Sequence, residues 1–356
     1  MGAQTLIIAE AGVNHNGNLE TALDLVSAAK AAGADAVKFQ TFDVDALVVR
    51  TAAKAEYQRL FTDATESQYE MLKKLQLDDS AHRILKARAD DLGIQFLSTA
   101  FDSASLRFLV QDLKLPILKI ASGEITNGPL LLEFAKSKRK LILSTGMSNL
   151  AEIQDALSVL AFGLIDGEDP SQSSFKDAFD SIAGKTALQK HVTVLHCTTE
   201  YPAPYESVNL NAMLSLQERF NLRVGYSDHT TGTLISPVAV ALGAEVIEKH
   251  ITIDKDMPGP DHQASLNPEE FSEMVRDVRN IQEALGAKKK VAQPAERGNL
   301  SVARKSLVAK IPIRIGEKYS DKNMTAKRPA VGRSPMDYWN LIGTTSPRDY
   351  DEDDLI

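Results

Sequence analysis

Residues 224–262, VGYSDHTTGTLISPVAVALGAEVIEKHITIDKDMPGPDH, contain two short apolar segments that each end in a histidine, His229 and His250. Between them, TGTLISPVAVALGAE has the pattern of a helix that stops at Gly243. A strand, a helix and a second strand in this order form a βαβ unit, whose strands are parallel neighbours. Both histidines are therefore predicted at the carboxyl end of a sheet, where α/β proteins place their functional sites.

The same alternation of a short apolar segment and an amphipathic helical stretch runs through residues 1–285. Six earlier segments are predicted to be buried strands: residues 6–10, 36–40, 94–99, 117–122, 141–145 and 192–196. Eight such units match an α/β fold of the (β/α)8 TIM-barrel type, with a doubly wound open sheet as the alternative. AEAGVNHNG, which overlaps the first strand, is not a GxGxxG dinucleotide-binding sequence. Residues 163–186 are long and polar, and we expect a surface loop there.

The alternation ends near residue 286, which suggests a second domain. Residues 286–303 are charged and lack apolar periodicity, so they are predicted to be a linker. Residues 304–356 contain short apolar segments between turn residues, typical of a small, mostly β domain. A domain of about 50 residues is small enough to gain stability by packing against a partner surface.

The composition excludes several classes of function. The chain has 356 residues with 40 Lys and Arg against 48 Asp and Glu, a net charge of −8, which argues against broad affinity for nucleic acid or anionic membranes. Its one cysteine, Cys197, is typical of a reducing compartment. The chain shows no signal-peptide pattern and no apolar segment near the roughly 20 residues of a membrane helix. We therefore expect a cytoplasmic protein.

Polar side chains are frequent at the predicted carboxyl ends of the strands. A lysine in such a crowded place is costly unless it meets an anion, and two lysines with several hydroxyl groups suit a phosphate or carboxylate. Each hydroxyl residue taken alone is more often a helix cap. Together they predict a site for an anionic, phosphorylated small molecule, formed by Lys38, Lys119 and hydroxyl groups that include Thr99, Ser122, Ser144, Thr199 and Ser227.

His229 and His250 are candidate ligands of a divalent metal ion, although a strand-end histidine can also be a hydrogen-bonded structural residue. Asp228 and Glu248 flank them and could orient the two rings. Two nitrogen ligands leave positions open for water and substrate, which suits Mn²⁺ or Mg²⁺, with Zn²⁺ as an alternative. Three further carboxylates remain for hydroxylated groups or proton transfer: Glu10, Glu124 and Asp261.

Many segments between residue 6 and about residue 343 resemble the bacterial sialic acid synthase family, the N-acetylneuraminate synthases. They include IIAEAGVNHNG, GADAVKFQTF, KAEYQ, KIASGEITNGPLL, LHCTTEYPAPYE, VGYSDHT, VIEKHITIDKDMPGPDH and KRPAVGRSPMDYWNLIG. The order SDH, EKH, GPDH and a C-terminal KRP is specific to that family. The C-terminal residues resemble its antifreeze-like (SAF) domain.

The resemblance implies a transferase of sialic acid biosynthesis. It would condense phosphoenolpyruvate with open-chain N-acetylmannosamine, giving a nine-carbon 2-keto acid and phosphate with C–O cleavage. The implied metal is Mn²⁺, with Mg²⁺ or Co²⁺ as alternatives. The implied assembly is a domain-swapped homodimer, in which Arg328 of one subunit meets the N-acetyl group in the other. An N,N'-diacetyllegionaminate or pseudaminate synthase acting on a 2,4-diacetamido-trideoxyhexose is the alternative for the sugar.

Carried over by position, the resemblance also assigns roles to single residues. The phosphoenolpyruvate contacts fall on Lys38, Thr99, Lys119, Ser122, Ser144, Thr199 and Ser227, and some relatives have Asn where this chain has Thr199. Tyr201 would lie between the substrates, and the sugar hydroxyls would meet Glu10, Gln40, Glu124 and Asp261. The predicted catalytic set is Glu124, Glu10, His229 and His250, with Glu124 first for proton transfer.

Two other functions remain open from the sequence. A class I aldolase would use Lys119 or Lys38 as a Schiff base. A non-catalytic carbohydrate-binding protein would use the C-terminal domain as its binding module.

Overall fold

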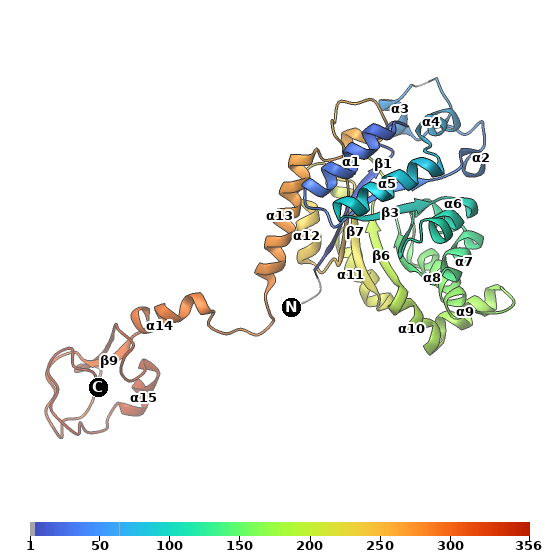
Figure 1. The fold of residues 1–356 in the computed structure, drawn as a ribbon. Coiled ribbons are helices and arrows are strands. Elements are labelled where there is room, and N and C mark those ends of the chain that lie inside the picture. Colours follow the sequence, from blue (N-terminus) through green and yellow to red (C-terminus); the bar gives the residue numbers. More distant parts are fainter. Residues whose placement is uncertain (1–3, 64) are drawn as a thin grey trace. The chain divides into compact units, whose positions relative to one another are not determined.

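The computed structural model describes residues 4–63 and 65–356 and divides the chain into two compact units. The barrel unit is Met1–Gly286 and the C-terminal unit is Ala287–Ile356. In the barrel unit, eight parallel strands pair in chain order and β8 pairs with β1, so the sheet is a closed barrel (Figure 1). The strands are β1 Leu6–Gly12, β2 Ala36–Thr41, β3 Gln95–Ala100, β4 Ile117–Ile120, β5 Lys140–Ser144, β6 Val192–Cys197, β7 Arg223–Asp228 and β8 Val246–His250.

This closed sheet confirms the predicted TIM barrel. Helices surround it in the order expected of β/α units, and Asn18 and Gly93 mark two of their ends. The Asn18 side chain accepts from the backbone N–H of Thr21, and Gly93 ends a helix in the left-handed conformation. The main covering helices are α1 Leu19–Ala31, α5 Asp79–Leu92, α6 Ser103–Arg107 continued by the π-helical η1 Phe108–Asp112, α7 Gly128–Lys136, α8 Leu150–Leu164, α11 Asn211–Phe220, α12 Ile235–Ala241 and α13 Pro268–Leu285.

Short helices also follow β2, where the chain makes a long connection before α5. They are α2 Val44–Leu47, α3 Glu56–Phe61 and α4 Gln68–Leu75. Ser67 caps α4 and exchanges hydrogen bonds with Glu70 in a capping box. This connection supplies part of the cavity described below.

The expectation of a surface loop over residues 163–186 is wrong, because two helices form there. They are α9 Gln172–Asp180 and α10 Ile182–His191, each begun by a serine, Ser171 or Ser181. The Phe175 ring packs edge-on against Phe162 of α8 with ring centroids 5.0 Å apart. Many residues of these helices are exposed and polar, so the sequence shows little of the apolar pattern by which the helices pack on the barrel.

The barrel interior has an apolar end and a polar end, because side chains of a strand alternate between two faces. Toward the amino ends of the strands, one buried cluster joins six strands: Ile8, Ala36, Leu97, Ile142, Leu195 and Val246. Two residues further along the same strands, the inward positions are Glu10, Lys38, Thr99, Ser144, Cys197 and Glu248. The apolar layer thus forms the floor of a polar cavity.

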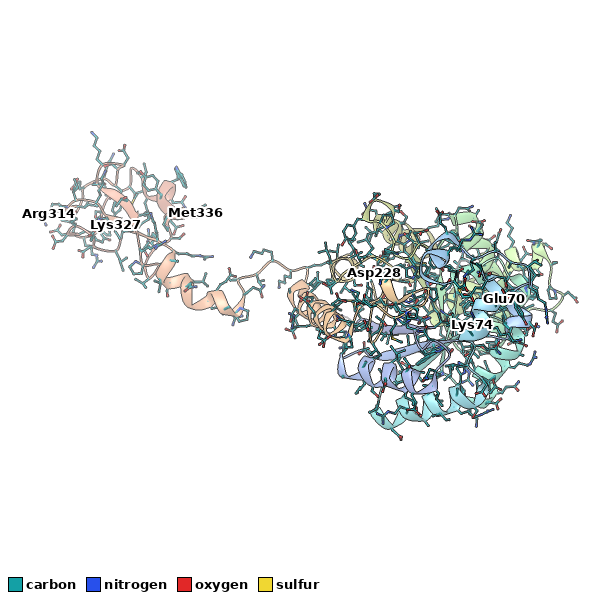
Figure 2. The ribbon with its side chains drawn as sticks, turned by 90° about the horizontal axis from the view of Figure 1, so that it is seen from above. Glu70, Lys74, Asp228, Arg314, Lys327 and Met336 are labelled. Atoms are coloured by element: carbon teal, nitrogen blue, oxygen red, sulfur yellow. The ribbon has the colours of Figure 1, made fainter. Side chains whose placement is uncertain are left out.

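The C-terminal unit contains a two-stranded antiparallel sheet, β9 Ser306–Ala309 and β10 Met324–Lys327. Its core includes Leu307, Ile313, Tyr319, Met324 and Tyr350. Arg314, Lys327 and Met336 lie on its surface (Figure 2). Its other elements are η5 Pro294–Glu296, α14 Arg297–Ala303, η6 Pro335–Asp337 and α15 Tyr338–Leu341.

The linker predicted from the sequence is partly helical. Residues 286–303, expected to be a linker, include η5 and the helix α14. Elsewhere, no helix in the described part of the chain is long and apolar enough to cross a membrane.

Candidate active site

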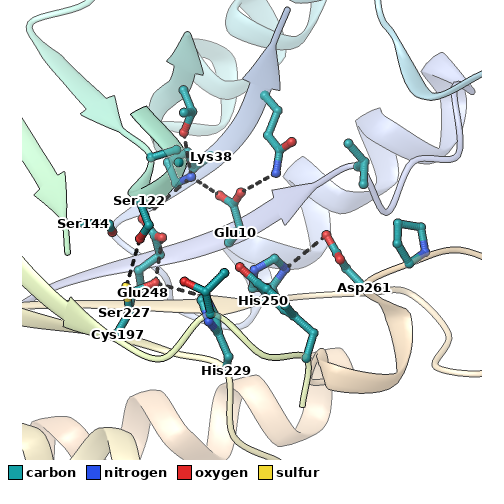
Figure 3. A pocket seen from close by; sticks show the side chains of 18 of the residues that line it. Glu10, Lys38, Ser122, Ser144, Cys197, Ser227, His229, Glu248, His250 and Asp261 are labelled. Carbon is teal, nitrogen blue, oxygen red and sulfur yellow. Dashed lines mark hydrogen bonds and ion pairs between the residues drawn. The ribbon is translucent and has the colours of Figure 1, made fainter. Parts of the chain in front are cut away.

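A cavity of about 180 Å³ lies at the carboxyl end of the barrel strands. Figure 3 shows that its labelled side chains come from several strands and point toward one another. The cavity brings together most residues singled out from the sequence: Glu10, Lys38, Gln40, Thr99, Lys119, Ser122, Ser144, Thr199, Tyr201, Ser227, His229, His250 and Asp261.

Strand register places these side chains at one level of the barrel. Glu10 lies opposite Lys38 on β2 and opposite His250 on β8. Thr99 lies opposite Lys119, and Ser227 lies opposite Glu248. Residues far apart in the chain therefore meet because the barrel closes.

Glu248 connects the two lysines of the cavity. Its Oε1 accepts from Lys119 Nζ at 3.1 Å and from Ser227 Oγ at 2.9 Å, and its Oε2 lies 3.7 Å from Lys38 Nζ. Lys38 Nζ also lies 2.6 Å from Glu10 Oε2 and donates to Thr99 Oγ1 at 2.9 Å. The sequence suggested that Glu248 orients a histidine, whereas the structure makes it the shared counterion of both lysines.

The carboxyl groups of the cavity differ in charge. Burial acts to raise the pKa of Glu248, but the Lys119 and Lys38 ammonium groups outweigh it and hold the pKa below its usual range. Burial raises the pKa of Glu10 to about 7 against the opposing effect of Lys38. Burial also raises the pKa of Asp261 to about 6. Glu248 therefore keeps its negative charge at neutral pH, while Glu10 and Asp261 can be protonated at a pH close to neutral.

Hydroxyl groups gather in one corner of the cavity. Ser122 Oγ accepts from the backbone N–H of Gly146 at 3.0 Å and lies 3.2 Å from Cys197 Sγ. Ser144 Oγ and Thr199 Oγ1 are buried and have no hydrogen-bond partner among the described residues. Unpartnered buried hydroxyls are costly, so this corner is suited to a ligand that accepts hydrogen bonds.

Gly146 keeps this corner open. A Cβ atom at Gly146 would lie 2.2 Å from Thr199 Oγ1 and 2.9 Å from Ser122 Oγ. A side chain there would displace both hydroxyl groups. The glycine is therefore required by a close approach.

The two histidines are neutral bases in this structure. Burial lowers the pKa of His229 to about 4, and burial together with His229 lowers the pKa of His250 well below its usual value. His229 Nδ1 donates to the carbonyl oxygen of Thr198 at 2.6 Å, which leaves Nε2 as an acceptor, 3.4 Å from Ser227 Oγ. The ring centroids of the two histidines are 5.5 Å apart.

These donor atoms could hold a divalent metal ion. His250 Nδ1 is buried without a hydrogen-bond partner among the described residues, 3.9 Å from Asp261 Oδ2. A neutral imidazole with an orphaned nitrogen is suited to a metal. In the described part of the chain no group of three or more His, Cys, Asp or Glu is arranged to hold an ion. Oxygen atoms of water or substrate would have to complete the coordination.

Three polar groups converge above Gly12. A Cβ atom at Gly12 would lie 3.4 Å from Glu10 Oε1, 3.5 Å from Gln40 Nε2 and 3.7 Å from Asp261 Oδ2. Gly12 has a φ of 52°, which favours glycine. Two carboxyl groups and one amide around a single point are suited to the hydroxyl groups of a sugar.

Aromatic rings close one side of the cavity. The Tyr201 ring lies 4.1 Å from His229 and 5.0 Å from Tyr57, measured between ring centroids. Tyr57 and Gln58 come from α3, which the sequence analysis did not connect with the site. Five apolar side chains that line the cavity were also missed: Val13, Met71, Leu72, Leu75 and Phe101.

Two predicted site residues are not among those that line the cavity. Glu124 lies in η2, Ser122–Glu124, just after β4, and its Oε2 accepts from Asn127 Nδ2 at 2.7 Å. Burial raises the pKa of Glu124. Arg328 belongs to the C-terminal unit. The roles assigned to both residues stay predictions.

The comparison with known proteins covers almost the whole chain. The model of the NeuB family matches residues 25–290. An N,N'-diacetyllegionaminic acid synthase from Campylobacter jejuni is 49% identical over 353 residues, which is 99% of each chain. Another from Legionella pneumophila is 44% identical over 338 residues, 95% of this chain and 89% of the relative.

A solved structure shares the fold. The N-acetylneuraminic acid (sialic acid) synthetase from Leptospira borgpetersenii, crystallised with citrate, is 31% identical to this chain. It superposes with a TM-score of 0.66 and covers 83% of this chain and 90% of its own.

Proposed function

This chain belongs to the NeuB family of sugar acid synthases, and from that membership we propose that it condenses phosphoenolpyruvate with an open-chain 2,4-diacetamido-2,4,6-trideoxyhexose. The product would be an N,N'-diacetyllegionaminic acid. The sequence motifs predict N-acetylneuraminate as the first choice of product, but the 49% identical relative favours the alternative, N,N'-diacetyllegionaminate. The cavity with its two lysines and two unpartnered hydroxyls is the structural observation that supports the proposal.

Lys38 and Lys119 would bind the anionic groups of phosphoenolpyruvate. Glu248 shares one negative charge between them, and Glu10 beside Lys38 has a pKa raised to about 7, so the cavity keeps positive charge for an entering anion when Glu10 is protonated. Ser144 and Thr199 supply the hydrogen-bond donors that lack partners in the described structure. A phosphate with many acceptor oxygens uses both features at once.

The sugar would lie against the polar groups above Gly12. Glu10, Gln40 and Asp261 can each accept or donate a hydrogen bond there. Tyr201 lies beside both histidines and would separate the sugar from phosphoenolpyruvate. In this proposal the aldehyde carbon would lie next to the enol carbon.

His229 and His250 would hold the metal ion, for which Mn²⁺ is the expectation. Both rings are neutral, and the orphaned Nδ1 of His250 fits a ligand atom. When bound, such an ion supplies Lewis-acid polarisation of a carbonyl oxygen. Thr198 fixes the tautomer of His229 through the bond to Nδ1.

The condensation joins C3 of phosphoenolpyruvate to C1 of the sugar and turns the aldehyde oxygen into a hydroxyl group. Water adds at C2 and loses both protons as the C2 carbonyl forms, and phosphate leaves with its bridging oxygen. One proton goes to the phosphate, and the other replaces the proton taken up by the new hydroxyl. The new hydroxyl needs one proton, and Glu10 is the carboxyl group of the cavity nearest to Lys38. We assign proton transfer to Glu10 from this position. Glu124, predicted for this role from the sequence, accepts a hydrogen bond from Asn127 and does not line the cavity, and its role stays a prediction.

The proposed assembly is a homodimer whose C-terminal units have the SAF fold. Arg328 of one subunit would complete the sugar site of the other. Arg328→Ala in a mixed dimer with a cavity-inactive subunit would test this complementation. Recovery of activity only when one subunit retains both parts would contradict the exchange.

The decisive experiment measures phosphate release from phosphoenolpyruvate with Mn²⁺ and a panel of 2-acetamido and 2,4-diacetamido hexoses. We expect the highest kcat/KM with 2,4-diacetamido-2,4,6-trideoxymannose. A preference for N-acetylmannosamine would restore the first interpretation. Borohydride treatment with substrate should trap no lysine adduct, whereas a stable adduct would support the class I aldolase.

A further inference from the structure

One side of the cavity is apolar, although every other side carries polar groups. Its side chains come from three segments and are called here the apolar wall. Val13 follows β1, Phe101 follows β3, and Met71, Leu72 and Leu75 belong to α4. Val13, Met71 and Leu75 are buried in one cluster, against which Leu72 and Phe101 pack.

The apolar wall lies beyond the lysines along the barrel axis. Phe101 is two residues after Thr99, which bonds to Lys38, and Val13 directly follows Gly12. Both segments are leaving the barrel at these points, whereas Lys38 and Lys119 sit at the level of Glu248. Among the described residues that line the cavity, these two lysines are the only Lys or Arg side chains.

The segment that carries most of the apolar wall has polar contacts of its own. Lys54 is buried within it, and its ammonium group donates to Thr62 Oγ1 at 2.7 Å and lies 3.3 Å from Glu66 Oε1. Glu66 also pairs with Lys74 of α4. These contacts link the start of the connection to α4, the helix that carries Leu72.

A sugar bound as proposed would reach the apolar wall with its far end. In the proposed binding mode, its aldehyde carbon would lie at the histidines and its hydroxyls at the polar groups above Gly12. The terminal carbon would then extend toward Val13 and α4. A methyl group there is buried against apolar atoms. A hydroxymethyl group would lose its hydrogen bonds to water, and a phosphate would be buried without a cation.

We propose that the apolar wall is a specificity determinant, which selects a hexose ending in a methyl group and rejects hexoses ending in a hydroxymethyl or phosphorylated carbon. This rests on the proposed function and adds the residues that read the end of the sugar. A single apolar contact of this kind discriminates by roughly 10- to 200-fold. The charged phosphate should be rejected more strongly than the hydroxyl group.

The test uses three sugars that differ only at the terminal carbon. They are 2,4-diacetamido-2,4,6-trideoxymannose, the 2,4-dideoxy sugar that keeps the 6-hydroxyl, and the 6-phosphate of the latter. For the native chain we expect kcat/KM to be at least about 10-fold lower with the 6-hydroxyl sugar than with the 6-deoxy sugar, and lower again with the 6-phosphate. A native chain that uses the 6-hydroxyl or 6-phosphate sugar as well as the 6-deoxy sugar would overturn the inference.

A pair of variants assigns the effect to the wall. Leu72→Asn places an amide in the cavity and should reduce the preference for the 6-deoxy sugar at least about 5-fold. Leu47→Asn is the matched control, because Leu47 packs on the same cluster, is also half-buried, but does not line the cavity. Its preference should equal that of the native chain.

Each outcome separates the two proposals. If Leu72→Asn and Leu47→Asn both keep the native preference for the 6-deoxy sugar, the apolar wall does not determine specificity, while the proposed function stands. If Leu72→Asn does not fold, Phe101→Tyr places a hydroxyl group in the wall and must lower the preference instead. If no diacetamido hexose releases phosphate with the native chain, both the proposed function and this inference fail.

Discussion

Replacing Lys249 by methionine would show how strongly the site depends on an ion pair that lies outside the cavity. Lys249 on β8 and Asp228 on β7 lie opposite each other and are both fully buried, with Nζ 3.2 Å from Oδ2. Asp228 lies deep inside the barrel unit (Figure 2). Each partner immediately precedes a histidine of the site, His229 or His250. The pair therefore fixes the two strand ends that carry these rings.

The magnitude follows from what Asp228 keeps after the substitution. Its carboxylate still accepts from the backbone N–H of Thr230 at 2.9 Å, from Thr230 Oγ1 at 2.7 Å and from Ser236 Oγ of α12 at 2.7 Å. Removing one partner of a buried ion pair lowers the free energy of unfolding by about 3–5 kcal/mol. The three remaining hydrogen bonds place the expected loss at the lower end, about 3 kcal/mol.

Urea unfolding of the full chain, followed by far-UV circular dichroism, measures this loss. Asp228→Asn combined with Lys249→Met removes both charges and should recover at least half of it. Lys86→Met is the control, because its pair with Asp90 is exposed and should contribute about 0–1 kcal/mol. The ion pair does not stabilise the fold as described if Lys249→Met unfolds at the native urea midpoint, or if the double variant is no more stable than the single one.

Four further substitutions test other parts of the structure. Lys119→Ala removes one of the two cavity lysines and should raise KM for phosphoenolpyruvate at least about 10-fold in phosphate-release rates; an unchanged KM would contradict its role. Glu10→Gln should lower kcat by about 10²–10⁴-fold, and a larger loss in Glu124→Gln would return proton transfer to Glu124. Burial lowers the pKa of His15 to about 4, so below pH 6.5 the unfolded chain binds more protons and stability falls as the pH drops toward 4. Urea unfolding at several pH values in this window gives the free energy of unfolding as a function of pH. Its slope should be shallower in His15→Gln by up to about 1.4 kcal/mol per pH unit, and equal slopes in the native chain and the variant would refute this.

The barrel and the polar half of its cavity were predictable because both follow from local patterns. Each strand has its own apolar segment, and alternation alone puts Lys38 with Gln40 and Glu248 with His250 on one face. The carboxyl-end rule of parallel sheets then gathers these residues. The partner of Glu248 was not predictable, since Lys119 is 129 residues away and meets it only through barrel closure.

The apolar half of the cavity could not be predicted for a different reason. Leu72 and Tyr57 lie in short helices after β2, where no strand end marks a functional position. An apolar residue on a short helix has the same sequence pattern whether it faces the core or a ligand. The position of Arg328 depends on the arrangement of the two units, which no local pattern encodes.

Barrel closure also has a consequence for folding during synthesis on the ribosome. Glu10 and His250 are register partners, and β8 is translated 240 residues after Glu10 (250 minus 10). At ordinary translation speeds this delay is on the order of 10 to 50 seconds. Throughout it, β1 exposes an unpaired edge that a chaperone can shield. Neither substrate can assist folding in that time, because the pocket that would receive it is completed by the last strand.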